Sequence, residues 1–166
     1  MIGRYGLFLL LTFSAFLPVL PLAENASAYD AQKSEFWYVI NPDHLSFKEA
    51  EQHCISLKGH LASIHSAVEH SVVNELTKLH GFHKYYAARL GAVRLPNTTT
   101  FIWNDESAWD FDDWLPTEPS VIKGEDNVGI FLGKWLSISL LEGRPSVCKV
   151  PASALRKAMK NLINNE

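Results

Sequence analysis

Two segments in the first half of the chain carry apolar residues at the spacing of an α-helix. Both begin with a serine that is followed three residues later by a glutamate, as in a capping box, and both end before a glycine: Ser46, Glu49 and Gly59, then Ser66, Glu69 and Gly81. The predicted apolar faces are Phe47, Ala50, Cys54 and Leu57, then Val72, Val73, Leu76 and Leu79. The pattern therefore predicts two amphipathic helices.

Short aromatic and β-branched segments, bounded by turn residues, predict the strands. These are Phe36–Ile40, Leu61–Ile64, Phe101–Trp103, Val128–Leu132, Lys134–Ile138 and Ser146–Val150. The first is followed by Asn41-Pro42-Asp43, which predicts a turn. Two early helices and a loop-rich antiparallel sheet indicate an α+β fold.

Residues 1–23 have the layout of a secretory signal peptide. Arg4 supplies a positive start, residues 7–22 carry no charge, and small residues follow. We expect cleavage after Ala23, or as late as residue 28, and an N-terminal linker over 24–35. The alternative is an uncleaved anchor, although Pro18 and Pro21 interrupt the apolar segment. The sequence therefore predicts a secreted, extracellular protein.

Secretion changes what the cysteines and asparagines can do. Cys54 and Cys148 are the two cysteines of the chain, and in an oxidising compartment we expect them to form a disulfide. The alternative is two free thiols. Asn97 and Asn25 each begin a sequon for N-glycosylation, and Asn25 matters only if cleavage occurs before it.

Several motifs, in order, resemble those of the C-type lectin-like domain. They are Phe47 to Ala50 with Cys54, Gly59 to Ile64 leading to Glu69, Trp103 to Asp105, Trp114 to Ser120, Glu125 to Val128, Gly133 to Trp135, and Val147 to Lys149. The resemblance covers residues 36–150. It implies a double-loop fold with two helices flanking small antiparallel sheets, and a disulfide between the first and last cysteines. It also implies ligand binding by a long loop, Asn97 to Lys123, where sugar-binding members of the family hold calcium.

The sequence departs from the family at the calcium site. The Glu-Pro-Asn triplet of the family is here Glu118-Pro119-Ser120, the Trp-Asn-Asp triplet is Trp135-Leu136-Ser137, and one further carboxylate is kept as Glu125. Calcium takes roughly six to eight oxygen ligands, several of them carboxylates. With Glu118 and Glu125 as the remaining anionic ligands, we expect no cofactor, or at most weakly bound calcium.

Two further departures concern the protein interior. The second disulfide of the family is absent, because its positions fall on Asn127 and Leu140. We therefore expect a looser segment between Gly124 and Leu140, unless its apolar side chains pack to compensate. Arg89 stands where the family usually has a tryptophan, and the sequence alone offers no interpretation of it.

The long loop is acidic and aromatic. The segment from Asn104 to Asp126 contains eight acidic residues and one basic residue, Lys123, and aromatic residues lie among them in the sequence. One hypothesis is a contact surface for a basic partner, formed by Trp109, Asp110, Asp112 and Asp113. The alternative is a solvated loop. The formal charge of −3 argues against nucleic acid as a partner.

The tail 151–166 lies outside the resemblance and predicts a basic amphipathic helix beginning near Ser153. Its apolar side could dock on the domain, pair with another chain or rest on an anionic membrane surface, so any membrane contact is expected here. The oligomeric state stays open. No catalytic motif is present, so we do not expect an enzyme.

These observations together predict a secreted binding module of the C-type lectin-like class that recognises a protein or glycan without calcium. One alternative is a lectin that binds carbohydrate through weakly held calcium. Another is a structural or assembly protein that acts through its C-terminal helix.

Overall fold

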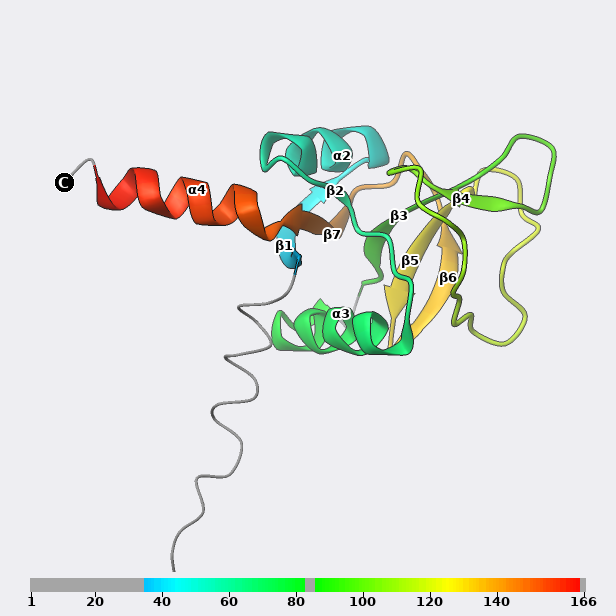
Figure 1. Ribbon diagram of the computed structural model, residues 1–166. Coiled ribbons are helices and arrows are strands. Elements are labelled where there is room, and N and C mark those ends of the chain that lie inside the picture. The colour runs from blue at the N-terminus through cyan, green and yellow to red at the C-terminus, as the bar shows by residue number, and fades with distance from the viewer. Residues whose placement is uncertain (1–34, 83–85, 165–166) are drawn as a thin grey trace, which may run out of the picture. The chain divides into compact units, whose positions relative to one another are not determined.

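The computed structural model describes residues 35–82 and 86–164 (Figure 1). The predicted signal peptide and the Asn25 sequon lie outside these ranges. Within them, no helix has the length and apolar character needed to cross a membrane. The elements are β1 (Phe36–Leu45), α2 (Phe47–Ser56), β2 (His60–Leu61), α3 (Ala67–Leu79), β3 (Ala88–Arg94), β4 (Phe101–Trp103), β5 (Asn127–Phe131), β6 (Lys134–Ile138), β7 (Arg144–Pro151) and α4 (Ala152–Ile163).

The strands of the described ranges form one sheet with the order β1-β7-β3-β5-β6, to which β2 adds beside β7 and β4 beside β3. All pairs are antiparallel except β3 and β7, which run parallel where Arg89 meets Ser146. Helices and a mixed sheet agree with the predicted α+β fold. The sheet is continuous, however, and contains this parallel pair, whereas separate antiparallel sheets were expected. Sequence patterning missed β3, because Arg89 and Gly91 interrupt its apolar residues although both are buried.

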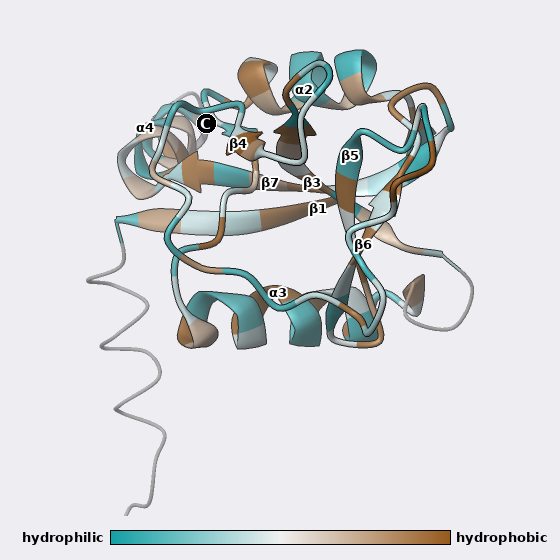
Figure 2. Ribbon diagram, turned by 90° about the vertical axis from the view of Figure 1, so that its right-hand side faces the viewer, coloured by the Kyte–Doolittle hydropathy of each residue, from teal (hydrophilic) through white to brown (hydrophobic). Residues whose placement is uncertain are grey.

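Helices α2 and α3 lie on opposite sides of the sheet, as Figures 1 and 2 both show. The predicted capping box of α2 is confirmed: Ser46 accepts from the Glu49 amide, and the Glu49 carboxylate accepts from the Ser46 amide at 3.0 Å. At α3, Ser66 accepts from the Glu69 amide at 3.2 Å, but the Glu69 carboxylate accepts from the His65 amide instead. Both predicted helix starts are therefore correct.

The buried face of α3 differs from the prediction. His70, Val73 and Thr77 are its buried residues, whereas Val72 is exposed and Leu79 is 81% exposed. The buried stripe follows the spacing i, i+3, i+7, so a histidine and a threonine occupy positions that the apolar pattern assigned elsewhere. Leu79 is the last residue of the helix.

Gly59 is required by a close approach and not by the end of α2. The residue with left-handed backbone after α2 is Lys58, with φ of 67°. A Cβ on Gly59 would lie 2.3 Å from the carbonyl oxygen of Lys149 in β7. The glycine thus lets the turn after α2 press against β7.

The predicted disulfide joins Cys54 of α2 to Cys148 of β7, with a Cα–Cα distance of 5.4 Å. Both cysteines are fully buried in a small cluster with Ala50, Leu61 and Val150. The bridge closes a loop of 94 residues and so ties the two ends of the domain together. Loop-entropy models assign about 4–5 kcal/mol to a loop of this length.

The turn predicted at Asn41-Pro42-Asp43 is wrong, because β1 continues through these residues to Leu45. The register against β7 shifts between Asn41 and Leu45, and the Asn41 side chain accepts from the Asp43 amide at 3.1 Å. Strand β1 lies at the edge of the sheet, where a proline removes no ladder hydrogen bond. The predicted strand over Leu61–Ile64 is likewise shorter, as β2 is only His60–Leu61.

A buried polar network occupies the region of the absent second disulfide. Asn127 is fully buried, accepts a hydrogen bond from Arg89 and donates to the carbonyls of Leu90 at 3.0 Å and Ala92 at 2.6 Å. Arg89 also donates to the carbonyls of Ser139 at 3.2 Å and Glu142 at 2.6 Å. Arg89 and Asn127 thus link β3, β5 and the segment after β6, the part of the chain in which we expected a looser structure.

Candidate functional site

Aromatic side chains hold the long loop between β4 and β5 against the core. Trp109 stacks on Trp103 with ring centroids 4.8 Å apart, and Trp114 lies edge-on to Trp135 at 5.9 Å. The backbone of the loop also bonds to β6, because the Leu115 amide donates to the Trp135 carbonyl at 2.8 Å. Trp109 is therefore half-buried, and its ring serves the core at least as much as the surface.

Three acidic side chains of the loop region pair with basic side chains of the chain. Asp110 accepts from His65 at 2.8 Å, and Asp113 accepts from Lys134 at 2.5 Å. Asp126 lies 3.3 Å from the Nε of Arg94. Asp112 is exposed, as is Asp110. The acidic surface expected from the sequence is thus partly neutralised by Arg94 of β3 and Lys134 of β6.

Asp105 fastens the start of the loop to the segment after β2. Its carboxylate accepts from Ser63 at 2.6 Å and from the Ser107 amide at 3.1 Å. Burial acts to raise the pKa of Asp105, but the hydrogen bonds from Ser107 and Ser63 and the charge of Lys149 outweigh it and lower the pKa. Asp105 therefore stays ionised and acts as an anchor for the loop.

Several side-chain oxygens at the positions of the family's calcium ligands accept hydrogen bonds from backbone amides. The Glu118 carboxylate accepts from the amides of Ser120 at 2.7 Å and Ser137 at 2.9 Å. The Ser120 hydroxyl accepts from the Ile122 amide at 3.0 Å, and the Ser137 hydroxyl accepts from the Ser120 amide at 3.0 Å. Pro119 follows a cis peptide bond, and Leu136 contributes no side-chain oxygen. The structure thus holds Glu118 and Ser120 of the loop against Ser137 of β6 through hydrogen bonds.

Arg94, which the sequence analysis did not single out, places a positive charge in the same region. Its Nη2 donates to the carbonyls of Ser120 and Glu125, the latter at 3.1 Å. Its guanidinium carbon lies 4.7 Å from the centroid of Phe101, and the side chain is only 10% exposed. The partners lie 26 and 31 residues away, so no local sequence signal points to them. Arg94 therefore joins β3 to both sides of the 120–125 turn.

The residues present do not fit a calcium site. A divalent cation near the Glu118 turn would meet the guanidinium of Arg94, which already occupies two carbonyls and pairs with Asp126. The family's third carboxylate and two amide ligands are replaced by side chains that provide neither charge nor, at Leu136, any oxygen. In the part of the chain that the structure describes, no group of three or more His, Cys, Asp or Glu side chains could hold a metal ion.

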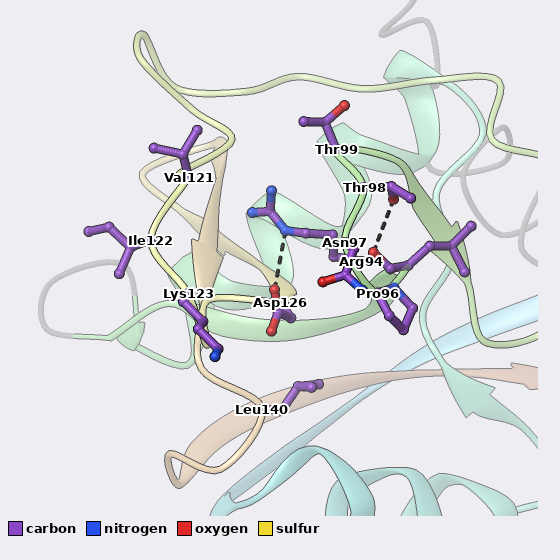
Figure 3. Close-up of a pocket in the computed structure, with 11 residues that line it drawn as sticks. Arg94, Pro96, Asn97, Thr98, Thr99, Val121, Ile122, Lys123, Asp126 and Leu140 are labelled. Carbon is purple, nitrogen blue, oxygen red and sulfur yellow. Dashed lines mark hydrogen bonds and ion pairs between the residues drawn. The ribbon is translucent and has the colours of Figure 1, made fainter.

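A pocket of about 610 Å³ lies beside this turn (Figure 3). One wall is the segment 94–99, the other is 121–123 with Asp126, and Leu140 adds an apolar side chain. Val121 and Ile122 line it although they are 89% and 62% exposed. Asn97 of the predicted sequon also lines the pocket. The pocket thus combines an aliphatic rim with charged and amide groups, and it lies at the two ends of the loop expected to bind a ligand.

Comparisons with known proteins agree with the resemblance to the C-type lectin-like domain. A family model described as the lectin C-type domain matches residues 43–150. The type-2 ice-structuring protein of Osmerus mordax is 31% identical over 71% of the chain and 67% of its own length. A lectin of Pleurodeles waltl is 33% identical over 68% of the chain and 69% of its own length. Herring type II antifreeze protein has a similar structure, with a TM-score of 0.63 at 26% identity over 71% of the chain and 92% of its own.

Proposed function

Because the chain belongs to the C-type lectin domain family, we propose that it is a secreted binding module that recognises an extracellular protein or glycan without calcium. The family and its structural neighbours are non-enzymatic binding proteins, so the chain is a lectin-like binding module and not an enzyme. Secretion is supported by the charge-free segment 7–22 after Arg4 and by relatives such as the ice-structuring protein.

The observation that carries calcium independence is the position of Arg94. The guanidinium binds the carbonyls of Ser120 and Glu125 and pairs with Asp126, so one partly buried positive charge orders the turn. A bound calcium ion would have to displace these contacts or share the region with a like charge, and both raise its free energy. These contacts support the proposal that the turn is ordered without a metal ion.

The pocket of Figure 3 is the proposed ligand site. Its volume of about 610 Å³ is within the usual range for small-ligand sites, about 300–1,000 Å³. The methyl groups of Val121 and Ile122 offer apolar contact to one face of a sugar ring or to a protein side chain. The ammonium group of Lys123 can hydrogen-bond to hydroxyl or carboxylate oxygens of the same ligand.

The family does not require calcium for its fold. Solved neighbours include a protein described as a Ca²⁺-dependent type II antifreeze protein in its Ca²⁺-free form, at a TM-score of 0.61, and a calcium-independent type II antifreeze protein, also at 0.61. The second is 20% identical and so speaks for the fold alone. A lectin-like domain that orders its loop with an arginine is consistent with neighbours that include both calcium-dependent and calcium-independent proteins.

The test is a screen of glycan and extracellular-protein arrays with the purified protein in excess chelator. We expect a ligand to bind in chelator, and Ile122→Gln to weaken it by about tenfold, because a lost aliphatic contact costs roughly 1.4 kcal/mol. Leu141→Gln is the matched control, since Leu141 is also highly exposed but is not part of the pocket. Binding that requires calcium, or that both variants retain equally, would contradict the proposal.

A further inference from the structure

Helix α4, Ala152–Ile163, is amphipathic along its whole length. At 100° per residue its apolar side chains fall on one side, in the series Ala154, Leu155, Ala158, Met159 and Ile163. Arg156, Lys157 and Lys160 fall on the other side, and residues 152–163 contain no acidic residue. The helix therefore carries a local charge of +3 in a chain whose formal charge is −3.

Among the side chains of α4 that the structure describes, those of the first turn are covered by the domain. Ala152 is fully buried, and Ala154 and Leu155 pack against the cluster around the disulfide. Further along the same stripe Met159 is 62% exposed and Ile163 is 71% exposed. In Figure 1 the helix runs away from the sheet on the side opposite the long loop. Docking on the domain thus explains the start of α4 but not the rest of its apolar stripe.

An exposed tryptophan borders the base of the helix. Trp37 of β1 is 43% exposed and pairs in register with Val150 of β7. Because directly opposed residues of an antiparallel pair point to the same face, Trp37 lies on the face that carries Val150, against whose cluster Leu155 packs. Trp37 is therefore an exposed aromatic side chain on the face of the sheet against which α4 begins.

We propose that the surface formed by α4 and Trp37 binds a membrane that contains anionic lipid headgroups. An amphipathic helix with lysines on its polar side and an adjacent tryptophan is the arrangement that lies in a bilayer interface. Charge complementarity selects the partner, because α4 has basic and no acidic side chains. Pairing between α4 and the α4 helix of a second copy would bring two positively charged helices together. Like-charge repulsion therefore disfavours a dimer formed through α4. The ligand pocket lies on the other side of the domain and would stay accessible.

The test measures co-sedimentation of the purified protein with vesicles of phosphatidylcholine alone and of phosphatidylcholine with phosphatidylglycerol. We expect binding to the anionic vesicles only, weakened by added salt. The double variant Lys157→Gln/Lys160→Gln should lower the partition coefficient about thirtyfold, since each basic side chain near an anionic surface contributes about 1 kcal/mol and 1.4 kcal/mol is tenfold. Met159→Ser should also lower it, through the apolar stripe.

Matched controls separate the surface from general charge and hydrophobicity. Lys48→Gln/Lys78→Gln changes the net charge equally on α2 and α3, and Leu79→Ser removes an exposed leucine from the end of α3. All variants share the same N-terminal segment, so differences between them report α4, and thermal melting checks that each is folded. Equal loss in tail and control variants, binding to neutral vesicles, or no vesicle binding would overturn the proposal. Concentration-dependent dimerisation that Met159→Ser abolishes would also overturn it, in favour of a second copy.

Discussion

At the scale of single residues, two arginines, the buried Arg89 and the partly buried Arg94, connect segments that are distant in the sequence. Arg89 bonds to Asn127 and to two carbonyls after β6, and Arg94 bonds to two carbonyls of the 120–125 turn. Burial lowers the pKa of Arg89 to about 10, an effect that Arg144 reinforces and Glu142 opposes, so the guanidinium stays charged at neutral pH. A buried charge of this kind stabilises the fold only while its hydrogen-bond partners are present.

Asn127→Ala should therefore lower the free energy of unfolding by about 2–3 kcal/mol, because it removes the side-chain oxygen that pairs with the buried Arg89. Chemical denaturation with urea measures the change. Asn161→Ala is the control, since Asn161 is exposed on α4, and we expect less than about 0.5 kcal/mol there. A similarly small loss in Asn127→Ala would show that Arg89 is solvated well without it.

The sequence predicted the disulfide but neither arginine, for a physical reason. Cys54 and Cys148 are the two cysteines of the chain, so one pairing is possible and secretion favours it. When an arginine donates to backbone carbonyls, the side chains of its partner residues play no part in the bond. The identity of those residues in the sequence therefore does not reveal the contact. Glu118 was predicted as a site residue, but its hydrogen bonds to amides could not be foreseen, because they depend on how the loop folds back.

At the scale of elements, the N-caps of the helices were predicted better than their buried faces. Ser46 and Ser66 mark the helix starts correctly because a cap is a local interaction between neighbouring residues. Which face of α3 is buried depends on the side chains that pack against the helix. The imidazole of His70 packs near the aromatic rings of Phe111 and Trp135, at centroid distances of 5.9 and 6.1 Å. Tertiary packing thus places a titratable side chain in the interface between α3 and the core.

This position predicts a pH dependence of stability. Burial lowers the pKa of His70 below its ordinary value of 6.5, with Asp113 opposing and Lys134 reinforcing the shift. The unfolded chain therefore binds a proton at a higher pH than the folded protein does. The free energy of unfolding should fall as the pH drops below about 6.5, until the folded form of His70 is protonated as well.

Urea denaturation at pH 7.5, 6.5 and 5.5 measures this dependence in the wild type and in His70→Leu. The difference between the two proteins isolates His70 from the other histidines. We expect the wild type to lose more stability on acidification than the variant. Parallel curves would show that burial does not depress the pKa of His70 enough to affect folding.

At the scale of the whole molecule, the described domain has two separate surfaces with different chemistry. The pocket between segments 94–99 and 121–126 lies at the long loop, and the basic amphipathic α4 leaves the sheet on the other side. Family membership was predictable because the motifs follow one another over nearly the whole domain. The family model, which matches residues 43–150, confirms this prediction. The pocket was not predictable, since its walls come from segments that meet only in the fold.

Thermal melting of the purified, oxidised protein in excess calcium and in excess chelator is the most direct test of a loop ordered by Arg94 without a metal ion. We expect identical melting temperatures, because Arg94 already bonds the carbonyls of Ser120 and Glu125. Calcium bound at 100 times its dissociation constant would add about 2.7 kcal/mol of stability and raise the melting temperature by several degrees. Such a rise in the wild type, lost in Glu118→Gln, would contradict calcium independence.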